Sequence, residues 1–383
     1  MIERLIGKHT TRLANEYPVV TITGPRQSGK TTLCRNLFSN KKYLSLEDPD
    51  VRRLALTDPR SFLEQVSGGA ILDEIQKAPE LVSYIQRIVD DAPIPGSFIL
   101  TGSEQFELTQ SISQSLAGRT AVLRLLPFSY SEIYGTSRSV DLDTCLYRGF
   151  YPRIHDQNLN PTEALGFYVN TYIERDVRSV KNIANLSQFE SFMRLCAANI
   201  GHEVNKSRLS NDIGVSLKTI SSWLSILEAS YIIFLLPPHF KNFRKRVTKS
   251  PKLYFYDVGL ASYLLGIREP SVIGAHPLRG NLFENFVVAE LLKQRFNSVN
   301  VNNLYFYRDN KGNEVDIVID EGHHFKSVEI KSSKTFTTDF LKGLDYYSKL
   351  NPDVAQSYLV FSGEDRQTIK GVKLTPYEFL DEI

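Results

Sequence analysis

The sequence is poor in cysteine and has no long apolar run. Its three cysteines, Cys34, Cys145 and Cys196, lie far apart in the 383 residues, so they can form neither a paired disulfide framework nor a Cys-x-x-Cys metal site. The longest apolar run, residues 231–236, is far shorter than the roughly 20 residues that span a bilayer. Residues 1–10 contain no apolar stretch typical of a secretory signal. We therefore expect a protein of the reducing cytoplasm with no membrane partner.

Neither sign of charge is in excess. Lysine and arginine together number 45 and aspartate and glutamate 43, which gives a formal net charge of +2. This balance excludes a uniformly basic surface for nucleic acid, but it allows a local basic patch. Hydrophobic residues make up 42% and charged residues 23%, so disorder is excluded as the main state. The length predicts two or three domains.

A glycine-rich segment at residues 24–32 fits the phosphate-binding pattern G-x-x-x-x-G-K-[ST]. A β-branched run at residues 19–23 predicts a buried strand before it, and apolar residues at helical spacing follow it. Strand, loop and helix therefore come in the order that a phosphate-binding loop requires. The loop residues are the expected nucleotide ligands: Gly24, Pro25, Arg26, Gln27, Ser28, Gly29, Lys30, Thr31 and Thr32.

The residue types in this loop suit a nucleoside triphosphate. Gly24 and Gly29 let the backbone turn its N–H groups toward phosphate, and the following helix adds the positive end of its dipole. Lys30 should reach the β- and γ-phosphates, and the Thr31 hydroxyl should bind Mg²⁺. The pattern therefore predicts ATP and Mg²⁺ as cofactors.

Two further strands end in polar residues that complete such a site. Residues 69–72 form an apolar strand before Asp73, which should hold Mg²⁺, and Glu74, which should polarise the attacking water. A strand at residues 97–100 leads to Thr101 and Ser103, and either could sense the γ-phosphate. These carboxylates and hydroxyls are the polar groups that ATP hydrolysis needs.

Arg119 follows a helix expected at residues 104–117. It could project across a subunit boundary as an arginine finger. Alternatively, it is a surface arginine of the kind that a helix C-terminus favours. The residue pattern alone supports both roles equally.

Residues 1–135 resemble the bacterial and archaeal AAA-type ATPases of the AAA_14 kind. The segments that carry this resemblance are residues 24–32, 46–49, 72–76, 100–103 and 115–119. In that lineage Arg119 occupies the position of the finger arginine, so the resemblance favours the finger role and implies a homo-oligomer.

The middle of the chain is expected to begin with helical structure over residues 142–180. Residues 147–153 and 172–177 resemble signature segments of DUF4143 proteins, which carry an AAA_14 domain at their N-terminal end. Arg148, Arg153 or Arg175 could contact the nucleotide as a second sensor. The sequence does not choose among them, and pairing with local carboxylates is an alternative for each.

Residues 205–236 predict a helix, a turn, a second helix and a strand, which together make a winged helix. The expected bounds are residues 207–213, 214–216, 217–230 and 231–236. Near the start of the second helix, where such motifs contact bases or phosphates, four side chains should face outward: Ser216, Lys218, Thr219 and Ser222.

A basic run follows the predicted winged helix. It contains no acidic residue and consists of Lys241, Arg244, Lys245, Arg246, Lys249 and Lys252. Together with the winged helix it indicates nucleic acid as a partner, DNA being favoured. The alternative is that the winged helix docks a protein.

The C-terminal part combines a helix and a hairpin that carry ionisable residues. An amphipathic helix at residues 280–292 bears Glu284, and strands are predicted at residues 305–308, 314–319 and 328–331. Strand alternation places Glu314 and Asp316 on one face, with Glu329 and Lys331 on one face of the returning strand.

One antiparallel register would bring these four side chains together. A hairpin centred near Gly322 sets Asp316 opposite Glu329 and Glu314 opposite Lys331. The other face would bury four apolar residues: Val315, Ile317, Val328 and Ile330.

This arrangement resembles the core of PD-(D/E)xK nucleases. Asp316, Glu329 and Lys331 match the D…ExK pattern, and Glu284 matches the acidic residue of the first helix. The position before Asp316 is Val315, not proline. The resemblance implies that Asp316, Glu329 and Glu284 bind Mg²⁺ and that Lys331 positions the nucleophile or stabilises the developing charge. The alternative is a nuclease-like fold that does not cleave, in which these residues form plain salt bridges.

The sequence therefore predicts an α/β protein of four parts. They are an AAA-type P-loop ATPase domain (residues 1–137), a helical lid (138–184), a winged-helix domain (185–252) and a restriction-endonuclease-like α/β domain (253–383). The expected function is a Mg²⁺-dependent ATPase that acts on or with nucleic acid. The alternatives are a nucleotide-switched DNA-binding or scaffold protein with an inactive nuclease fold, and an ATPase that acts on a protein partner.

Overall fold

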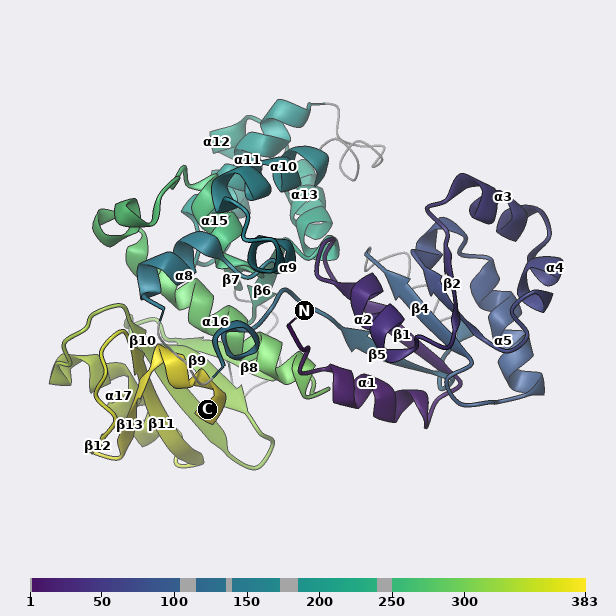
Figure 1. Ribbon diagram of the computed structural model, residues 1–383. Coiled ribbons are helices and arrows are strands. Elements are labelled where there is room, and N and C mark those ends of the chain that lie inside the picture. The colour runs from purple at the N-terminus through teal and green to yellow at the C-terminus, as the bar shows by residue number, and fades with distance from the viewer. Residues whose placement is uncertain (1, 104–114, 136–139, 173–184, 240–249) are drawn as a thin grey trace. The chain divides into compact units, whose positions relative to one another are not determined.

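The computed structural model describes residues 2–103, 115–135, 140–172, 185–239 and 250–383. It divides into two units, which are considered separately (Figure 1). The first consists of Met1–Phe128, Ala229–Tyr231 and Arg295–Asn300, and the second of Ser129–Glu228, Ile232–Gln294 and Val301–Ile383. Most of the helix expected at residues 104–117 lies outside the described residues.

The first unit is built on a five-stranded parallel sheet. The strand order is β2 (Lys42–Ser45), β3 (Ala70–Asp73), β4 (Phe98–Gly102), β1 (Val19–Thr23) and β5 (Thr120–Arg124), and all neighbouring pairs are parallel. Every residue of β1, β3 and β4 is buried, as expected for central strands covered on both faces. The carboxyl ends of these strands meet at one edge, where α/β proteins bind ligands.

Helices cover both faces of this sheet (Figure 1). One face packs against α1 (Gly7–Ala14) and α2 (Lys30–Leu37), through a core that includes Leu13 and Leu33. The other face packs against α4 (Pro59–Glu64) and α5 (Leu81–Asp91), through a core that includes Phe62 and Ile85. Two short elements complete this side: α3 (Pro49–Thr57) and η1 (Ile75–Lys77).

The second unit begins with short helices where one helical stretch was expected. The elements are α7 (Tyr130–Tyr134), α8 (Leu142–Arg148), α9 (Pro152–Asp156) and α10 (Pro161–Tyr172). The described residues from 142 onward are thus largely helical, as expected, but they are divided into short helices. Gly149 ends α8 with a φ of 61°, and prolines begin α9 and α10, because proline suits the first turn of a helix and breaks its interior. Residues 173–180 lie outside the described residues.

The predicted helix–turn–helix segment is present within a residue or two of the expected bounds. It contains α12 (Lys206–Ile213) and α13 (Leu217–Ala229), and α11 (Leu186–Ala198) precedes it. The side chain of Asn205 caps α12, and Gly214 ends it in the left-handed conformation. The next strand, β6 (Ile233–Leu236), starts two residues later than expected and pairs with β7 (Lys252–Phe255) in antiparallel fashion.

The C-terminal part of the second unit is a six-stranded mixed sheet. The strand order is β12 (Thr368–Ile369), β13 (Val372–Pro376), β11 (Val354–Phe361), β10 (Phe325–Lys331), β9 (Glu314–Asp320) and β8 (Leu304–Arg308). The helical elements in and before this part are α15 (Val258–Leu264), η3 (Pro270–Ala275), α16 (Arg279–Asn297), η4 (Thr338–Leu341), α17 (Lys342–Leu350) and η5 (Tyr377–Glu382).

The β9–β10 hairpin has the predicted register over only part of its length. Pairing runs from Asp320 with Phe325 to Ile317 with Val328 and continues no further. The expected backbone pairs of Asp316 with Glu329 and Glu314 with Lys331 do not form. Instead, Asp316 Oδ2 accepts the Ile330 N–H at 2.8 Å, so a carboxylate takes the place of the next strand carbonyl.

A buried ion pair lies on α16. Lys293 Nζ is 2.7 Å from Glu290 Oε1, and the two side chains are 2% and 3% exposed. Glu290 Oε2 also accepts the backbone N–H of Tyr130 at 2.7 Å, and the ammonium lies 4.2 Å from the ring centroid of Phe150. These contacts tie α16 to α7 and to the segment after α8, because neither charge can be buried without its partner.

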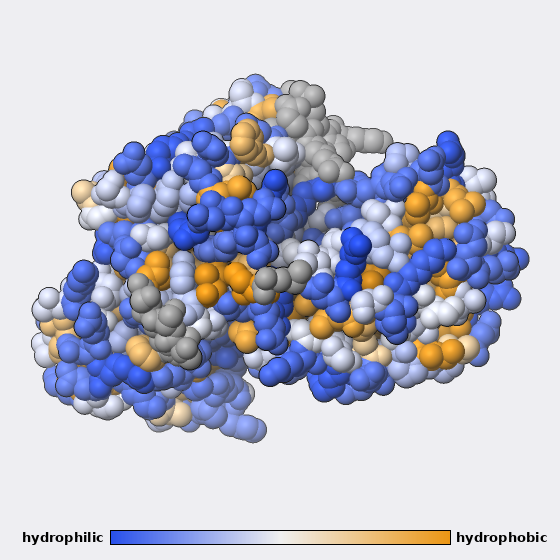
Figure 2. All heavy atoms as spheres, viewed as in Figure 1, coloured by the Kyte–Doolittle hydropathy of each residue, from blue (hydrophilic) through white to orange (hydrophobic). Residues whose placement is uncertain are grey.

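The surface is polar with scattered apolar residues. Figure 2 shows them in small separate patches over the face drawn. Exposed large residues such as Phe167 and Val301 are dispersed along the chain, as is normal in folded proteins. None of the helices in the described ranges is long and apolar enough to cross a membrane.

We predict that Lys293→Met destabilises the protein by leaving the Glu290 carboxylate buried and uncompensated. The free energy of unfolding should fall by about 3–5 kcal/mol, the usual cost of removing one partner of a buried pair. The double variant Glu290→Gln/Lys293→Met should recover most of this loss. Urea unfolding followed by circular dichroism measures both.

The matched control is Arg194→Met. Arg194 pairs with Glu190 on α11, but both side chains are exposed, at 48% and 42%. Removing this pair should change the free energy of unfolding by less than about 1 kcal/mol. A double variant as unstable as Lys293→Met alone would contradict the ion-pair explanation.

Candidate functional site

The phosphate-binding pattern forms a tight loop between β1 and α2. Gly24 has a φ of 149°, and a Cβ at this position would collide with the carbonyl oxygen of Leu125. Gly29 has a φ of 90° and lies directly before the first turn of α2, which begins at Lys30. Both positions therefore require glycine, and the helix N-terminus adjoins the loop as a phosphate site needs.

Lys30 is folded back over this loop. Its Nζ donates hydrogen bonds of 2.9 Å to the carbonyl oxygens of Gly24 and Pro25, and the residue is 5% exposed. Burial lowers the pKa of Lys30, while the charges of Glu74 and Asp73 oppose that effect. The ammonium is thus held at the loop by neutral acceptors, which anionic phosphate oxygens can replace with stronger charge-assisted bonds.

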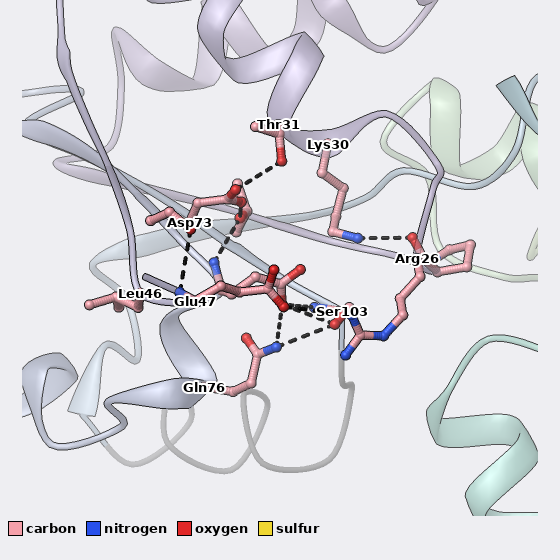
Figure 3. A network of polar contacts seen from close by, with 12 residues as sticks. Arg26, Lys30, Thr31, Leu46, Glu47, Asp73, Gln76 and Ser103 are labelled. Atoms are coloured by element: carbon pink, nitrogen blue, oxygen red, sulfur yellow. Dashed lines mark hydrogen bonds and ion pairs between the residues drawn. The ribbon is translucent and has the colours of Figure 1, made fainter. Parts of the chain in front are cut away.

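Asp73 accepts hydrogen bonds from three hydroxyl groups, and Figure 3 labels one of them, Thr31. Its Oδ2 accepts from Thr31 Oγ1 at 2.9 Å and from Tyr43 Oη at 2.6 Å, and its Oδ1 accepts from Thr101 Oγ1. These groups come from α2, β2 and β4, so the carboxylate at the end of β3 links neighbouring elements of the sheet edge. The Thr31 hydroxyl and the Asp73 carboxylate are hard oxygen donors of the kind that Mg²⁺ prefers, so the residues fit this cation.

Glu74 follows Asp73 in the left-handed conformation, with a φ of 58°. Its Oε2 accepts from Ser103 Oγ at 2.9 Å, from the Ser103 N–H at 3.3 Å and from Gln76 Nε2 (Figure 3). Burial opposes its ionisation, but the charge of Lys30 and the hydrogen bonds from Gln76 and Ser103 outweigh burial and lower the pKa. The carboxylate is therefore ionised and can accept a proton.

The remaining loop residues differ in exposure. Pro25 and Ser28 are buried, Gln27 and Thr32 are exposed, and Arg26 is half-buried with its guanidinium 3.7 Å from Glu47. Gln27 has a φ of 61°, a strained conformation for a residue with a side chain.

Arg119 is engaged with α5 in this chain. Its Nη2 donates to Asp90 Oδ2 at 3.0 Å, its Nε donates to Asp90 Oδ1, and its Nη1 donates to the carbonyl of Ala117 at 3.0 Å. The guanidinium is 35% exposed. A finger role would require it to leave Asp90, which a surface ion pair allows at low cost.

The three arginines considered as second sensors do not lie in the unit that contains the phosphate-binding loop, as far as the structure describes them. Arg148 ends α8 and Arg153 lies on α9, where it donates to Gln157 Oε1 at 3.1 Å. Both belong to the second unit. Arg175 lies outside the described residues. Their assignment as sensors stays a prediction.

Four residues of the nucleotide site were not assigned a role there from the sequence. Tyr43 holds Asp73, and Gln76 holds Glu74. Arg4 donates to the carbonyls of Ser28 at 2.8 Å and Leu126 at 2.7 Å, which braces the loop. Tyr231 donates to Thr23 Oγ1 at 2.8 Å, directly before the loop. Arg4, Tyr43 and Tyr231 reach the site from distant parts of the chain, so no local pattern identifies them.

A second polar cluster lies in the C-terminal part and contains the four acidic residues that the sequence singled out there. We define the carboxylate cluster as Glu284 on α16, Glu314 and Asp316 on β9, and Glu329 on β10. Glu329 Oε1 lies 2.5 Å from Lys331 Nζ. Asp316 and Glu329 are each 8% exposed, whereas the side chains of Glu314 and Lys331 are 31% and 34% exposed.

The central cation of this cluster is Lys252, which the sequence placed at the end of the basic run. Its Nζ lies 3.0 Å from Glu284 Oε1 and 2.5 Å from Glu314 Oε1, and its side chain is 3% exposed. Lys252 is therefore not a surface cation, and its inclusion in a nucleic-acid-binding run was wrong. Residues 241–249 of that run lie outside the described residues.

The charged groups of the cluster shift one another's pKa values. Burial lowers the pKa of Lys252, but the charges of Glu284, Asp316 and Glu314 raise it. The net effect is a raised pKa. Burial and the Asp316 charge raise the pKa of Glu329, which favours its protonated form. Glu329 Oε2 has no hydrogen-bond partner within the described part of the chain.

The cluster does not fit the divalent cation that the nuclease resemblance implies. Glu284 Oε1 is taken by Lys252 and by Tyr254 Oη at 2.5 Å, and Asp316 Oδ2 by a backbone N–H. Within the described ranges, no three His, Cys, Asp or Glu residues are grouped so that they could hold one metal ion. The carboxylates gather as predicted, but around an ammonium group.

An open cavity of about 420 Å³ adjoins β7 and β8. It lies between the start of α12 and β8, and its polar lining includes Asn199, His202, Glu203, Arg208 and Arg308. Arg308 also lies 3.7 Å from Glu314 Oε2, so the cavity wall adjoins the carboxylate cluster. Ser216, directly before α13, and Lys218 on α13 are exposed, and Thr219 and Ser222 are partly exposed.

Three regions of the chain match family models. Residues 16–134 match an AAA domain (AAA_14), residues 139–271 match a domain of unknown function (DUF8612), and residues 279–380 match another (DUF4143). Two curated relatives are the uncharacterized proteins Rv2008c of Mycobacterium tuberculosis and Mb2031c of Mycobacterium bovis. Each is 30% identical over 329 residues, which cover 85% of this chain and 72% of the relative.

Two solved structures are similar to part of this chain at a low level. The Walker-type ATPase PABY2304 of Pyrococcus abyssi is 15% identical, with a TM-score of 0.46, over 68% of this chain and 94% of that one. The AMPPCP-bound DnaA of Aquifex aeolicus is 14% identical, with a TM-score of 0.30, over 58% of this chain and 86% of that one.

We predict that Tyr43→Phe weakens Mg²⁺ binding in the nucleotide complex. The change removes the hydroxyl that orients Asp73, and loss of such a supporting hydrogen bond costs about tenfold or more in metal affinity. Titration of Mg²⁺ into the complex with a fluorescent ATP analogue measures the effect. Tyr84→Phe, in the core packed on the other face of the sheet, is the matched control and should leave the affinity unchanged. Equal Mg²⁺ affinity in Tyr43→Phe and wild type would contradict the role of Tyr43.

Proposed function

The chain belongs to the family that joins an AAA_14 domain to a DUF4143 region, and from this premise we propose that it binds and hydrolyses ATP with Mg²⁺, acting on or with nucleic acid. The observation that carries the ATPase proposal is the arrangement around Asp73 and Glu74. Asp73 contacts the Thr31 hydroxyl next to the loop, and Glu74 lies beside Ser103 as an ionised carboxylate. These contacts support roles for both acids beside a Mg²⁺-bound triphosphate.

Each residue has a defined part in this proposal. The loop N–H groups and Lys30 bind the phosphates, and Thr31 and Asp73 would hold Mg²⁺, which neutralises phosphate charge when bound. Glu74 orients the water and accepts its proton as the bond to the γ-phosphorus forms and the bond to the β–γ bridging oxygen breaks. Thr101 and Ser103, which already contact the two acids, would sense the γ-phosphate.

Glu74 is held away from solvent by Gln76 and Ser103. Activation of water therefore requires at least one of these hydrogen bonds to be exchanged. Arg119 would likewise leave Asp90 to stabilise the transition state in a neighbouring subunit of a homo-oligomer. The exchange at Arg119 would couple hydrolysis to assembly, because the arginine would act in a neighbouring subunit.

The nucleic-acid part of the proposal rests on the second unit. The α12–α13 segment presents Ser216 and Lys218 to solvent, and the cavity beside it carries Arg208 and Arg308. Such donors suit phosphate groups of a nucleic-acid backbone. We also propose that the chain consists of an ATPase domain, a lid, a winged helix and a nuclease-like domain. Docking of a protein on the same segment is the alternative.

For the C-terminal region, the contacts of Lys252 favour a fold that does not cleave. Metal-dependent cleavage needs a divalent cation among Glu284, Asp316 and Glu329. Lys252 pairs with Glu284 and Glu314 in the same cluster. We therefore favour a nucleotide-driven protein whose nuclease-like region serves binding.

We predict that Glu74→Gln retains ATP binding and loses hydrolysis. Removal of the carboxylate that accepts the proton should lower the rate by about 100-fold or more, because glutamine keeps the shape but not the basicity. Release of phosphate and binding of a fluorescent ATP analogue are measured side by side, with and without DNA. Glu80→Gln, on the exposed start of α5, is the control and should hydrolyse ATP at the wild-type rate. Full activity in Glu74→Gln would refute the assignment.

We predict that DNA binding depends on the basic run. The double variant Lys245→Gln/Arg246→Gln removes two phosphate-binding charges, so the slope of log affinity against log salt should fall by about 2. Fluorescence anisotropy with labelled DNA at several salt concentrations measures the slope. Lys8→Gln/Lys311→Gln removes the same charge from exposed positions elsewhere. Equal slopes for the two double variants would favour the protein-docking alternative.

A further inference from the structure

We propose that Lys252 is the resident cation of the carboxylate cluster and that the folded region consequently takes up no divalent metal there. This inference rests on the non-cleaving function favoured above and extends it, because it names the group that excludes the metal. It is independent of ATP hydrolysis, which takes place in the other unit.

The position of the ammonium group carries the inference. It lies within 3.0 Å of Glu284 Oε1 and 2.5 Å of Glu314 Oε1, so one cation bridges α16 and β9. The ring centroid of Phe306 lies 5.5 Å away. A divalent cation bound between the same two carboxylates would occupy the space of this ammonium, and like charges so close together repel strongly in a buried site.

Lys252 cannot easily withdraw from this position. Its backbone is paired with Leu236 in β6 on one side and bridged to Glu203 on the other. Its side chain is 3% exposed. Moving the ammonium into water would leave Glu284 and Glu314 without their shared cation, and breaking a buried pair in this way is costly.

The neighbouring groups are matched to a monovalent cation. Tyr254 donates to the same oxygen of Glu284 that Lys252 contacts, and the Ile330 N–H donates to Asp316. Lys331 supplies a second ammonium to Glu329. Each of these three carboxylates therefore already has a donor on one oxygen, whereas Glu329 Oε2 has none within the described residues. Metal binding at the occupied oxygens would require several of these contacts to break together.

The test measures metal binding directly, on the full-length chain without nucleotide. Mn²⁺ is titrated into the protein, and the free ion is followed by electron paramagnetic resonance. Wild type and Asp316→Asn should show the same weak background. Lys252→Met should gain one site per chain, with affinity at least about tenfold above that background, and the double variant Lys252→Met/Asp316→Asn should lose it.

Lys326→Met is the matched control. Lys326 lies on the same strand as Glu329 but pairs with Glu321, outside the cluster. It removes the same charge and should gain no site. A gain in Lys326→Met equal to that in Lys252→Met would overturn the inference, because the effect would then reflect net charge alone.

Two further results would overturn the proposal. One is Mn²⁺ binding in the wild type, without nucleotide, that Asp316→Asn abolishes; this comparison decides the question even where Lys252→Met fails to fold. The other is a folded Lys252→Met, with wild-type circular dichroism, that gains no site. Binding that requires ATP and is lost in Thr31→Ala belongs to the nucleotide site and so tests the ATPase proposal instead.

Discussion

The Asp73 carboxylate is the interaction on which the nucleotide site depends. A carboxylate removed from water must find donors or a cation. Asp73 finds them in the hydroxyls of Thr31, Tyr43 and Thr101, which belong to the loop helix and to the two strands on either side of β3. Satisfying this one group fixes the ends of β2, β3 and β4 against α2. The site is therefore assembled by the same contacts that hold the edge of the sheet together.

Much of this arrangement could be predicted from local order in the sequence. The glycine loop lies between a β-branched strand and a helix, and Asp73 ends an apolar strand, so short-range patterns contain both features. The hairpin of β9 and β10 could be predicted because strand alternation and a turn at Gly322 determine a register, and that register holds from Asp320 to Ile317. Each of these predictions depends on residues close together in the chain.

The rest depends on contacts between distant segments. Tyr43, Arg4 and Tyr231 reach the loop through packing that no spacing rule describes. Lys252 looked like part of a basic run because lysines and arginines precede it closely in sequence, whereas its strand carries it into a buried cluster. The last two pairs of the hairpin fail because the Asp316 side chain competes successfully for the Ile330 N–H.

Both carboxylate sites satisfy buried carboxylates with hydrogen-bond or ionic donors. These donors differ in how easily a metal can replace them. At Asp73 the donors are neutral hydroxyls, which can rotate, and one of them, Thr31, can itself become a ligand. In the C-terminal cluster the donor is a lysine anchored in a paired strand, whose charge repels any second cation. Exchange of hydrogen bonds for a metal is thus inexpensive at the first site and opposed by electrostatics at the second. On this argument, we expect the set of acidic residues at Asp73 to bind a divalent ion and the C-terminal set to exclude it. The neighbouring donors, rather than the acids themselves, determine this difference.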